Sequence, residues 1–117
     1  MKLLRAVAVL HAAAVCAQPL LAGLYLNGDS GAIPIHELVG LTAAALCLVQ
    51  LVLTLLITRL ARLVLLAAAV LAGEVLMIHA GYGRDLALHI PLGMALVAGS
   101  VALAAWAVRY RRTAVAA

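Results

Sequence analysis

The sequence predicts an all-α integral membrane protein, a single four-helix bundle, and three observations lead to this prediction. Of its 117 residues, 68% are hydrophobic and 10% are charged, and the mean hydropathy is +1.24, so a domain of this size could not bury its apolar surface away from water. The apolar residues form four runs of about 20 residues, the length that spans a bilayer: residues 3–26, 36–57, 63–80 and 89–108. Most of the cations gather at one end of these runs.

The positions of the basic residues predict the orientation of the runs. Lys2 and Arg5 precede the first run, Arg59 and Arg62 separate the second from the third, and Arg84 would lie alone on the opposite side; the remaining arginines follow the fourth run: Arg109, Arg111 and Arg112. Because cytoplasmic loops retain Lys and Arg, both termini are expected to be cytoplasmic, in a plasma (inner) membrane. The net charge of +4 therefore indicates topology and not nucleic-acid binding, which would need a soluble basic face.

The first run, residues 3–26, has the basic start of a signal peptide, but its apolar stretch is long enough to span, so we expect it to be retained. Pro19 removes one helical hydrogen bond and predicts a local kink. Asn27-Gly28 is a strong turn signal at its end. Cys16 in this run and Cys47 in the second fall near mid-membrane, so both are expected to be buried thiols and not a disulfide.

The second and fourth runs each open on a histidine that is followed four residues later by a glycine, in Ile35-His36-Glu37-Leu38-Val39-Gly40 and in Leu88-His89-Ile90-Pro91-Leu92-Gly93. Residues at this spacing share one helical face, and the glycines would let a flat cofactor approach closely. A faint repeat of half the chain suggests two tandem helix pairs. Such a repeat would place the two histidines face to face near the outer surface, where they could ligate a haem.

The third run carries Glu74 close to mid-membrane, where a carboxyl is costly and marks a candidate functional site. It could be hydrogen-bonded to a neighbour such as Gln18 or a threonine, or it could act as a proton relay to a redox site. The sequence favours neither role over the other.

The remaining histidines and the outer arginine are weaker candidates. His79 lies near the outer side and is expected to be hydrogen-bonded across the bundle; if functional, it would lie over the haem edge, relay a proton or bind a second metal. His11 has no histidine at matching depth, which favours a structural role. Arg84 could pair with haem propionates, or with Asp85 or Asp29 in water.

At these residues the chain resembles one four-helix half of the haem A synthase family, whose halves each carry an axial histidine pair on the second and fourth helices. Gln18-Pro19-Leu20-Leu21-Ala22-Gly23, continuing to Ser30-Gly31, is similar to the family's Gln-x-x-Leu-Gly helix end and Ser-Gly loop. Ile35–Gly40 resembles its Ile-His-Arg-Leu-Leu-Gly segment, and Leu88-His89 its fourth-helix Leu-His. A small actinobacterial four-helix membrane family of unknown function has a comparable pattern.

The departures from the family concern its catalytic half. That half has a glutamate three residues before the second-helix histidine and an arginine just after it, whereas this chain has Ile33 and Glu37 there. The resemblance therefore implies haem binding more than haem A synthesis.

The sequence thus predicts a cytochrome b-like protein with one haem b per chain near the outer face, with His36 and His89 as iron ligands and Gly40, Gly93, His79 and Arg84 as further contacts. Two imidazoles leave no open coordination site, which suits electron transfer or haem handling. Two alternatives stay open: a haem-modifying enzyme similar to haem A synthase, and a cofactor-free accessory subunit whose histidines only cap their helices. Because a monomer would expose a haem edge, we expect a homo-oligomer or a larger respiratory membrane complex.

Overall fold

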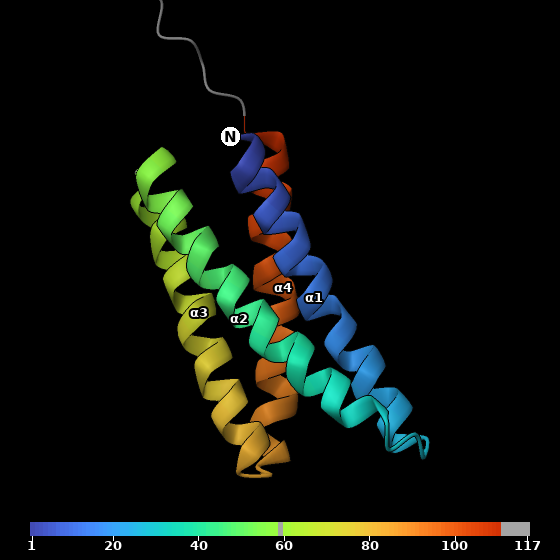
Figure 1. Ribbon diagram of the computed structural model, residues 1–117. Helices are drawn as coiled ribbons and strands as arrows, with labels where there is room; N and C mark the ends of the chain where they lie inside the picture. Colours follow the sequence, from blue (N-terminus) through green and yellow to red (C-terminus); the bar gives the residue numbers. More distant parts are fainter. Residues whose placement is uncertain (59, 111–117) are drawn as a thin grey trace, which may run out of the picture.

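The computed structural model describes residues 1–58 and 60–110, and this part of the chain forms four helices (Figure 1). They are α1 (Lys2–Leu26), α2 (Ala32–Ile57), α3 (Ala61–Tyr82) and α4 (Leu86–Arg109). Each is long and apolar enough to cross a membrane. The prediction of an all-α chain with four such helices is confirmed. Arg59, Arg111 and Arg112 lie outside the described residues.

Two of the helices begin about one turn earlier than the apolar pattern predicts. In α2 the first turn contains Pro34, whose fixed φ suits that position. In α4 the side chain of Asp85 caps the helix by accepting a hydrogen bond from the Leu88 backbone N–H at 3.1 Å. The added first turns are themselves apolar, so the helix starts are set by Gly31 and by the Asp85 cap and not by the histidines that follow them.

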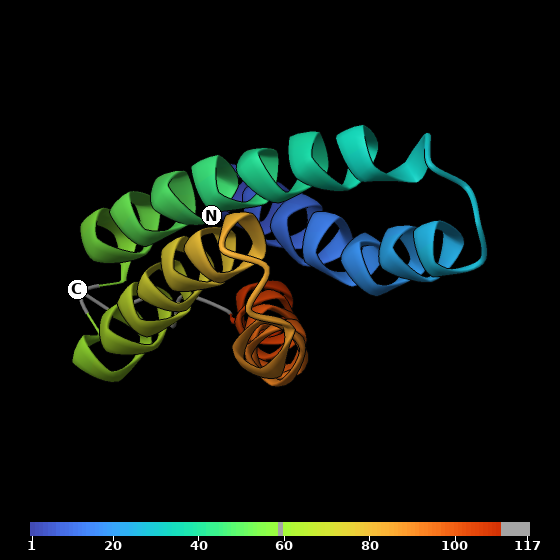
Figure 2. The same ribbon diagram turned by 90° about the horizontal axis from the view of Figure 1, so that it is seen from below.

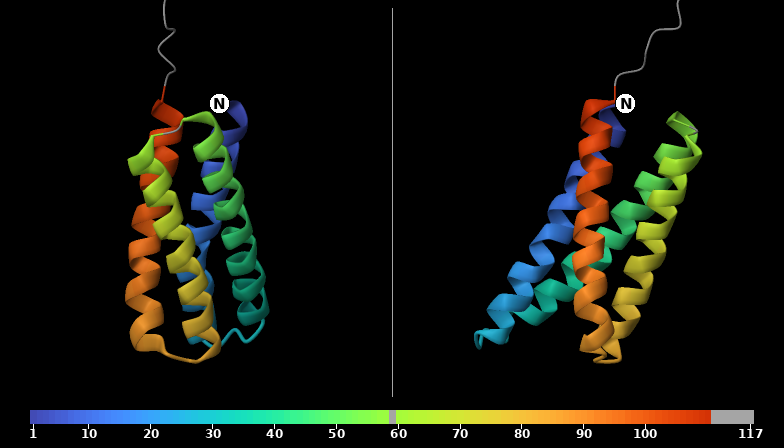
Figure 3. Two further views of the ribbon diagram at one scale, coloured as in Figure 1. Left: turned by 90° about the vertical axis from the view of Figure 1, so that its left-hand side faces the viewer. Right: turned by 180° about the vertical axis from the view of Figure 1, so that it is seen from behind.

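The helices form a ring in which each one packs against its neighbours in sequence and α4 closes against α1 (Figure 3). The α1–α3 and α2–α4 pairs are therefore diagonal. At the end of the bundle that holds the start of α1, the guanidinium of Arg5 donates to the backbone oxygens of Ala107 at 3.1 Å and Tyr110 at 2.8 Å. These bonds fasten the end of α4 to α1.

At the opposite end of the bundle, the two helical hairpins diverge. The α1–α2 loop and the α3–α4 loop lie well apart in Figure 1, and the view from below in Figure 2 separates them again. We call this end of the bundle the loop end. The divergence leaves a space between the hairpins that the site described below occupies.

The core is built largely from small and branched apolar residues. One cluster joins the helices in the middle of the bundle: Val15, Ala43, Cys47, Ala67, Val70, Met77, Leu96 and Leu103. A second joins α1 to α4: Leu4, Ala8, Ala12, Ala104 and Ala107. Many large apolar side chains stay exposed on the outside of all four helices. A surface of this kind suits contact with lipid.

The expectation that both cysteines are buried is wrong for Cys16. Cys47 is buried in the core, whereas Cys16 is exposed on the outer side of α1. Mid-membrane depth sets the position of a residue along the helix axis, but not the side of the helix from which it projects. Pro19 lies within α1, which continues as one helix from Lys2 to Leu26.

Candidate functional site

A cavity of about 340 Å³ lies between the two hairpins at the loop end, with walls from all four helices. We call it the inter-hairpin cavity. Most of its lining is apolar, and its polar side chains include Gln18 of α1, His36 and Glu37 of α2, and His89 of α4. Pockets of this type, apolar with a few convergent polar groups, are typical sites for a small ligand or a cofactor.

The structure brings the predicted ligand pair His36 and His89 together across this cavity. Although α2 and α4 are diagonal, the two ring centroids are 6.1 Å apart and the ring planes are inclined by 48°. In a metal-bound imidazole the metal–nitrogen distance is about 2 Å, and the ring centre lies about 1 Å beyond that nitrogen. Two imidazoles on opposite sides of one metal therefore have their ring centres about 6 Å apart. The observed spacing therefore matches a bis-imidazole site.

The ring of His89 is held by the backbone of α3. His89 Nδ1 lies 2.8 Å from the carbonyl oxygen of Met77, and because a carbonyl only accepts, Nδ1 carries the proton and donates. This leaves Nε2 as the nitrogen that can bind a metal. The ring lies so close to α3 that a Cβ at Gly81 would be 3.0 Å from His89 Cε1. The sequence pattern did not single out Met77 or Gly81, because both act through tertiary contact.

Two polar atoms near the other side of the cavity lack partners. Within the described residues, neither His36 Nδ1 nor Gln18 Nε2 has a hydrogen-bond partner, although both atoms are buried. Gly40 lies beside Gln18: a Cβ added at Gly40 would be 3.7 Å from Gln18 Nε2, an ordinary van der Waals distance. Buried polar atoms are normally hydrogen-bonded, so these two atoms indicate a cavity suited to a ligand or to ordered water.

The other predicted cofactor contacts lie away from the cavity. Gly93 belongs to the α3–α4 contact, where its Cβ would lie 3.3 Å from Met77 Sδ. His79 is exposed on α3, and Arg84 lies in the α3–α4 loop with a φ of 57°. Neither side chain contributes to the cavity wall. His79 follows Met77 by two residues, which places it on a different side of the helix.

The alternative hypothesis assumed that His36 and His89 cap their helices, and the structure does not place them at the cap positions. The residues at the N-cap positions are Gly31 for α2 and Asp85 for α4. His36 and His89 lie within the helices and face the cavity. At the cavity rim, the Tyr82 hydroxyl donates to the carboxylate of Glu37 and links α3 to α2.

A second polar group of residues lies deeper in the bundle, and it includes Glu74. Its carboxylate Oε1 is 2.6 Å from His11 Nε2, and His11 Nδ1 is 2.9 Å from Gln50 Oε1. Glu74 is thus hydrogen-bonded to another helix, one of the two roles that the sequence left open, but the partner is His11 and not Gln18 or a threonine. The sequence could have indicated this contact, because His11, Gln50 and Glu74 occupy comparable depths in their apolar runs. A search for a second histidine at the depth of His11 does not find these partners.

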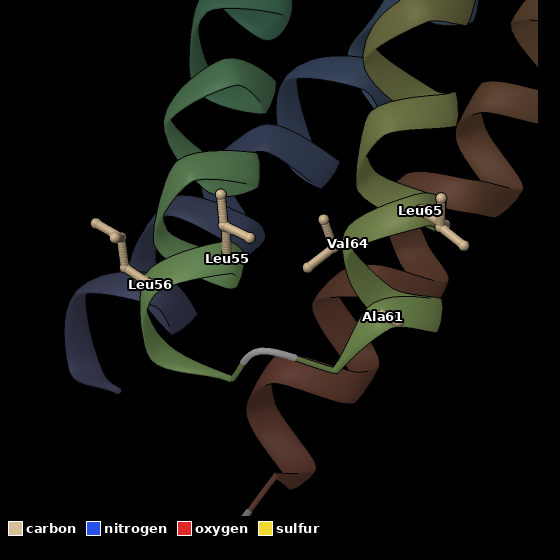
Figure 4. A pocket seen from close by; sticks show the side chains of 5 residues that line it. All are labelled: Leu55, Leu56, Ala61, Val64 and Leu65. Carbon is tan, nitrogen blue, oxygen red and sulfur yellow. The ribbon is translucent and has the colours of Figure 1, made fainter.

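An apolar depression of about 580 Å³ lies at the opposite end of the bundle, between α2 and α3 (Figure 4). Five side chains line it: Leu55, Leu56, Ala61, Val64 and Leu65. None carries a polar or reactive atom, so it offers no chemistry. Its apolar lining is compatible with contact to lipid.

Comparison of the chain with protein-family models, with curated proteins and with solved structures finds no match. The resemblance to one half of haem A synthase therefore stays a prediction from short motifs.

Proposed function

We propose that the protein is a multi-pass membrane protein that binds one haem b in the inter-hairpin cavity, where His36 and His89 would hold the iron. The observation that supports this most directly is that two imidazoles line the cavity with their centroids 6.1 Å apart and their planes inclined by 48°. The residues that surround them fit a haem in their chemistry. The walls are mainly apolar, and His36 Nδ1 has no partner among the described residues.

Each imidazole has a separate means of support. The Met77 carbonyl accepts from His89 Nδ1, and such a contact fixes the orientation of a metal-binding histidine and increases its basicity. Half-buried His36 has no partner at Nδ1 within the described part of the chain, but its ring interacts through a hydrogen bond with the backbone of Gln18 in α1. Each of the two rings is therefore supported by the backbone of a neighbouring helix.

Held by His36 and His89, a haem would supply one-electron transfer, because two imidazole ligands would leave no coordination site for oxygen. The apolar walls exclude water and set the potential through burial. Electron transfer or haem handling is therefore the function that we favour. Haem modification is less well supported, because Ile33 occupies the place of the carboxylate in the family that the chain resembles.

The placement of charge supports an orientation with both termini in the cytoplasm and the cavity towards the outer face of the plasma membrane. Lys2, Arg5, Arg62 and Arg109 all lie at the end of the bundle opposite the cavity, and Arg84 lies at the loop end. This is the asymmetry expected when cytoplasmic ends retain cations. Because the cavity opens between two hairpins, we also propose that a second copy or a larger respiratory complex covers it.

The test is an absorption spectrum of the detergent-purified protein, oxidised and then dithionite-reduced, with pyridine extraction to identify the haem. We expect a sharp low-spin reduced spectrum that is lost in both His36→Ala and His89→Ala and kept in His79→Ala, whose side chain lies outside the cavity. Helical circular dichroism checks that each variant is folded. A protein that remains colourless after haem is supplied during expression would refute the proposal.

A Gly81→Ala variant tests the predicted geometry more finely. Its new Cβ would lie 3.0 Å from His89 Cε1 and 3.2 Å from Nδ1, so the ring must move away from the Met77 carbonyl. We expect a lower haem content after purification, or a shifted reduced spectrum. Unchanged haem content and spectrum would show that the support of His89 by α3 is unimportant.

A further inference from the structure

Three side chains with metal-binding atoms converge in the interior of the bundle, apart from the inter-hairpin cavity. They are His11 of α1, Cys47 of α2 and Glu74 of α3, and one ligand atom from each lies within 4.8 Å of the others. Their exposed fractions are 0%, 0% and 2%. Three different helices therefore deliver a nitrogen, a sulfur and an oxygen to one enclosed point.

The hydrogen bonds around His11 orient it for ligation. Gln50 Oε1, an amide oxygen that only accepts, lies 2.9 Å from His11 Nδ1, so Nδ1 carries a proton and donates. His11 Nε2 then points into the cluster, 2.6 Å from Glu74 Oε1, and the two atoms share one proton. Metal-binding histidines typically donate their second ring N–H to an acceptor in this way.

The second oxygen of Glu74 is an independent observation in favour of a ligand. Glu74 Oε2 is buried, and within residues 1–58 and 60–110 it has no partner at ordinary hydrogen-bond geometry; the side chain beside the carboxylate is Cys47, whose thiol donates to the Ala67 carbonyl oxygen at 3.8 Å and also interacts with Glu74. Leaving a carboxyl oxygen unpaired in an apolar interior is costly. A cation at the cluster would remove that cost.

The balance of charge permits a divalent ion. Without metal, the cluster is neutral as a whole when Cys47 keeps its thiol proton and one proton is shared between His11 and Glu74. When both protons leave, a thiolate, a carboxylate and a neutral imidazole balance a charge of +2. Binding of one divalent ion with release of two protons thus leaves the interior without net charge, as a low-dielectric environment requires.

We infer that His11, Cys47 and Glu74 form a buried site for a divalent transition-metal ion, with the chemistry of Zn²⁺. Zinc binds imidazole, thiolate and carboxylate together and has no geometric preference from its d electrons, whereas Mg²⁺ and Ca²⁺ prefer oxygen ligands alone. Neighbouring ligands of tetrahedral zinc are about 3.3 Å apart at bond lengths of about 2.0–2.1 Å. His11 Nε2 and Glu74 Oε1 therefore separate slightly as the ion replaces their proton.

The test uses tag-free protein in detergent that is stripped with a chelator and then given Zn²⁺ or Co²⁺. After desalting, elemental analysis should find about one zinc per chain, and the cobalt form should have a thiolate-to-metal absorption band. Cys47→Ser should remove that band and weaken zinc binding more than tenfold. Cys16→Ser, at the only other cysteine in the chain and exposed on α1, should change neither.

Two further variants keep the test valid if the core is sensitive to substitution. Glu74→Gln can still hydrogen-bond to His11 but carries no charge, so it should fold and bind zinc more than tenfold more weakly. Gln50→Ala removes only the acceptor for His11 Nδ1, and we expect a loss of about 10–100-fold.

Several results would overturn the inference: less than one zinc per chain in folded protein, a cobalt form without a thiolate band, or equal binding by Cys47→Ser and the parent. The cluster would then be a proton-sharing contact that only joins the helices. The proposal is independent of haem binding. His36→Ala and His89→Ala should retain the zinc site, and a colourless protein that binds zinc would refute the haem proposal alone.

Discussion

Replacing Glu74 with leucine should destabilise the metal-free bundle by about 1–2 kcal/mol. The substitution removes the 2.6 Å contact to His11 and leaves a fully buried imidazole nitrogen without its partner. Hydrogen bonds to charged groups contribute about 1.5–3 kcal/mol, and stranding a buried polar group costs about 1–3 kcal/mol. Contacts between membrane helices tend to the lower part of such ranges. Leucine has similar bulk, so little of the effect should come from a cavity.

A double-mutant cycle isolates the interaction itself. His11→Leu should cost a similar amount, because it strands Glu74 and Gln50, but the double variant should cost about 1–2 kcal/mol less than the sum of the single variants, since neither partner is then left alone. The measurement is reversible unfolding in detergent with a chelator present, followed by helical circular dichroism.

Additive costs in this cycle would refute the reasoning, because they would mean that the two buried side chains do not depend on each other. Tyr82 and Glu37 provide a matched control at the rim of the cavity. They are also hydrogen-bonded between helices, but both are exposed. Since exposed pairs contribute little, Tyr82→Phe combined with Glu37→Gln should give no measurable coupling.

Two other contacts lead to further predictions. Gly99→Ala should lower the free energy of unfolding by about 1–2 kcal/mol, because its Cβ would lie 2.9 Å from Cγ2 of Val70, a stiff β-branched side chain. The control is Gly23→Ala, which has nothing within 4 Å and should be neutral or slightly stabilising. Equal thermal unfolding of the two variants would contradict the close α3–α4 packing. Arg5→Ala removes the hydrogen bonds that hold the end of α4. Amide hydrogen exchange at Tyr110 should then accelerate about tenfold, which corresponds to a loss of about 1.4 kcal/mol of local stability. Exchange at the parent's rate would show that these bonds do not restrain the helix end.

The sequence predicts well those features that depend only on the position of a residue along the chain, such as the length of a helix. An apolar run of about 20 residues predicts a spanning helix whatever its neighbours are, and all four predicted runs correspond to helices of the structure. The matching positions of His36 and His89 at the starts of their runs indicated equal depth. Their meeting across the bundle follows from that depth together with the ring order of the helices.

The direction in which each residue projects around its helix was decided only by the tertiary structure. Cys16 and Cys47 were predicted to lie at similar depth, yet one is exposed on α1 and the other is buried. His79 and His89 both belong to the loop end, yet His79 is exposed and does not line the cavity, whereas His11 joins Glu74 in the core. The physical reason is that lipid is as apolar as the interior of the bundle, so the sequence of a membrane helix marks its buried side only weakly. The length and depth of the helices are therefore properties of the sequence alone, but the partners of each side chain depend on how the helices pack.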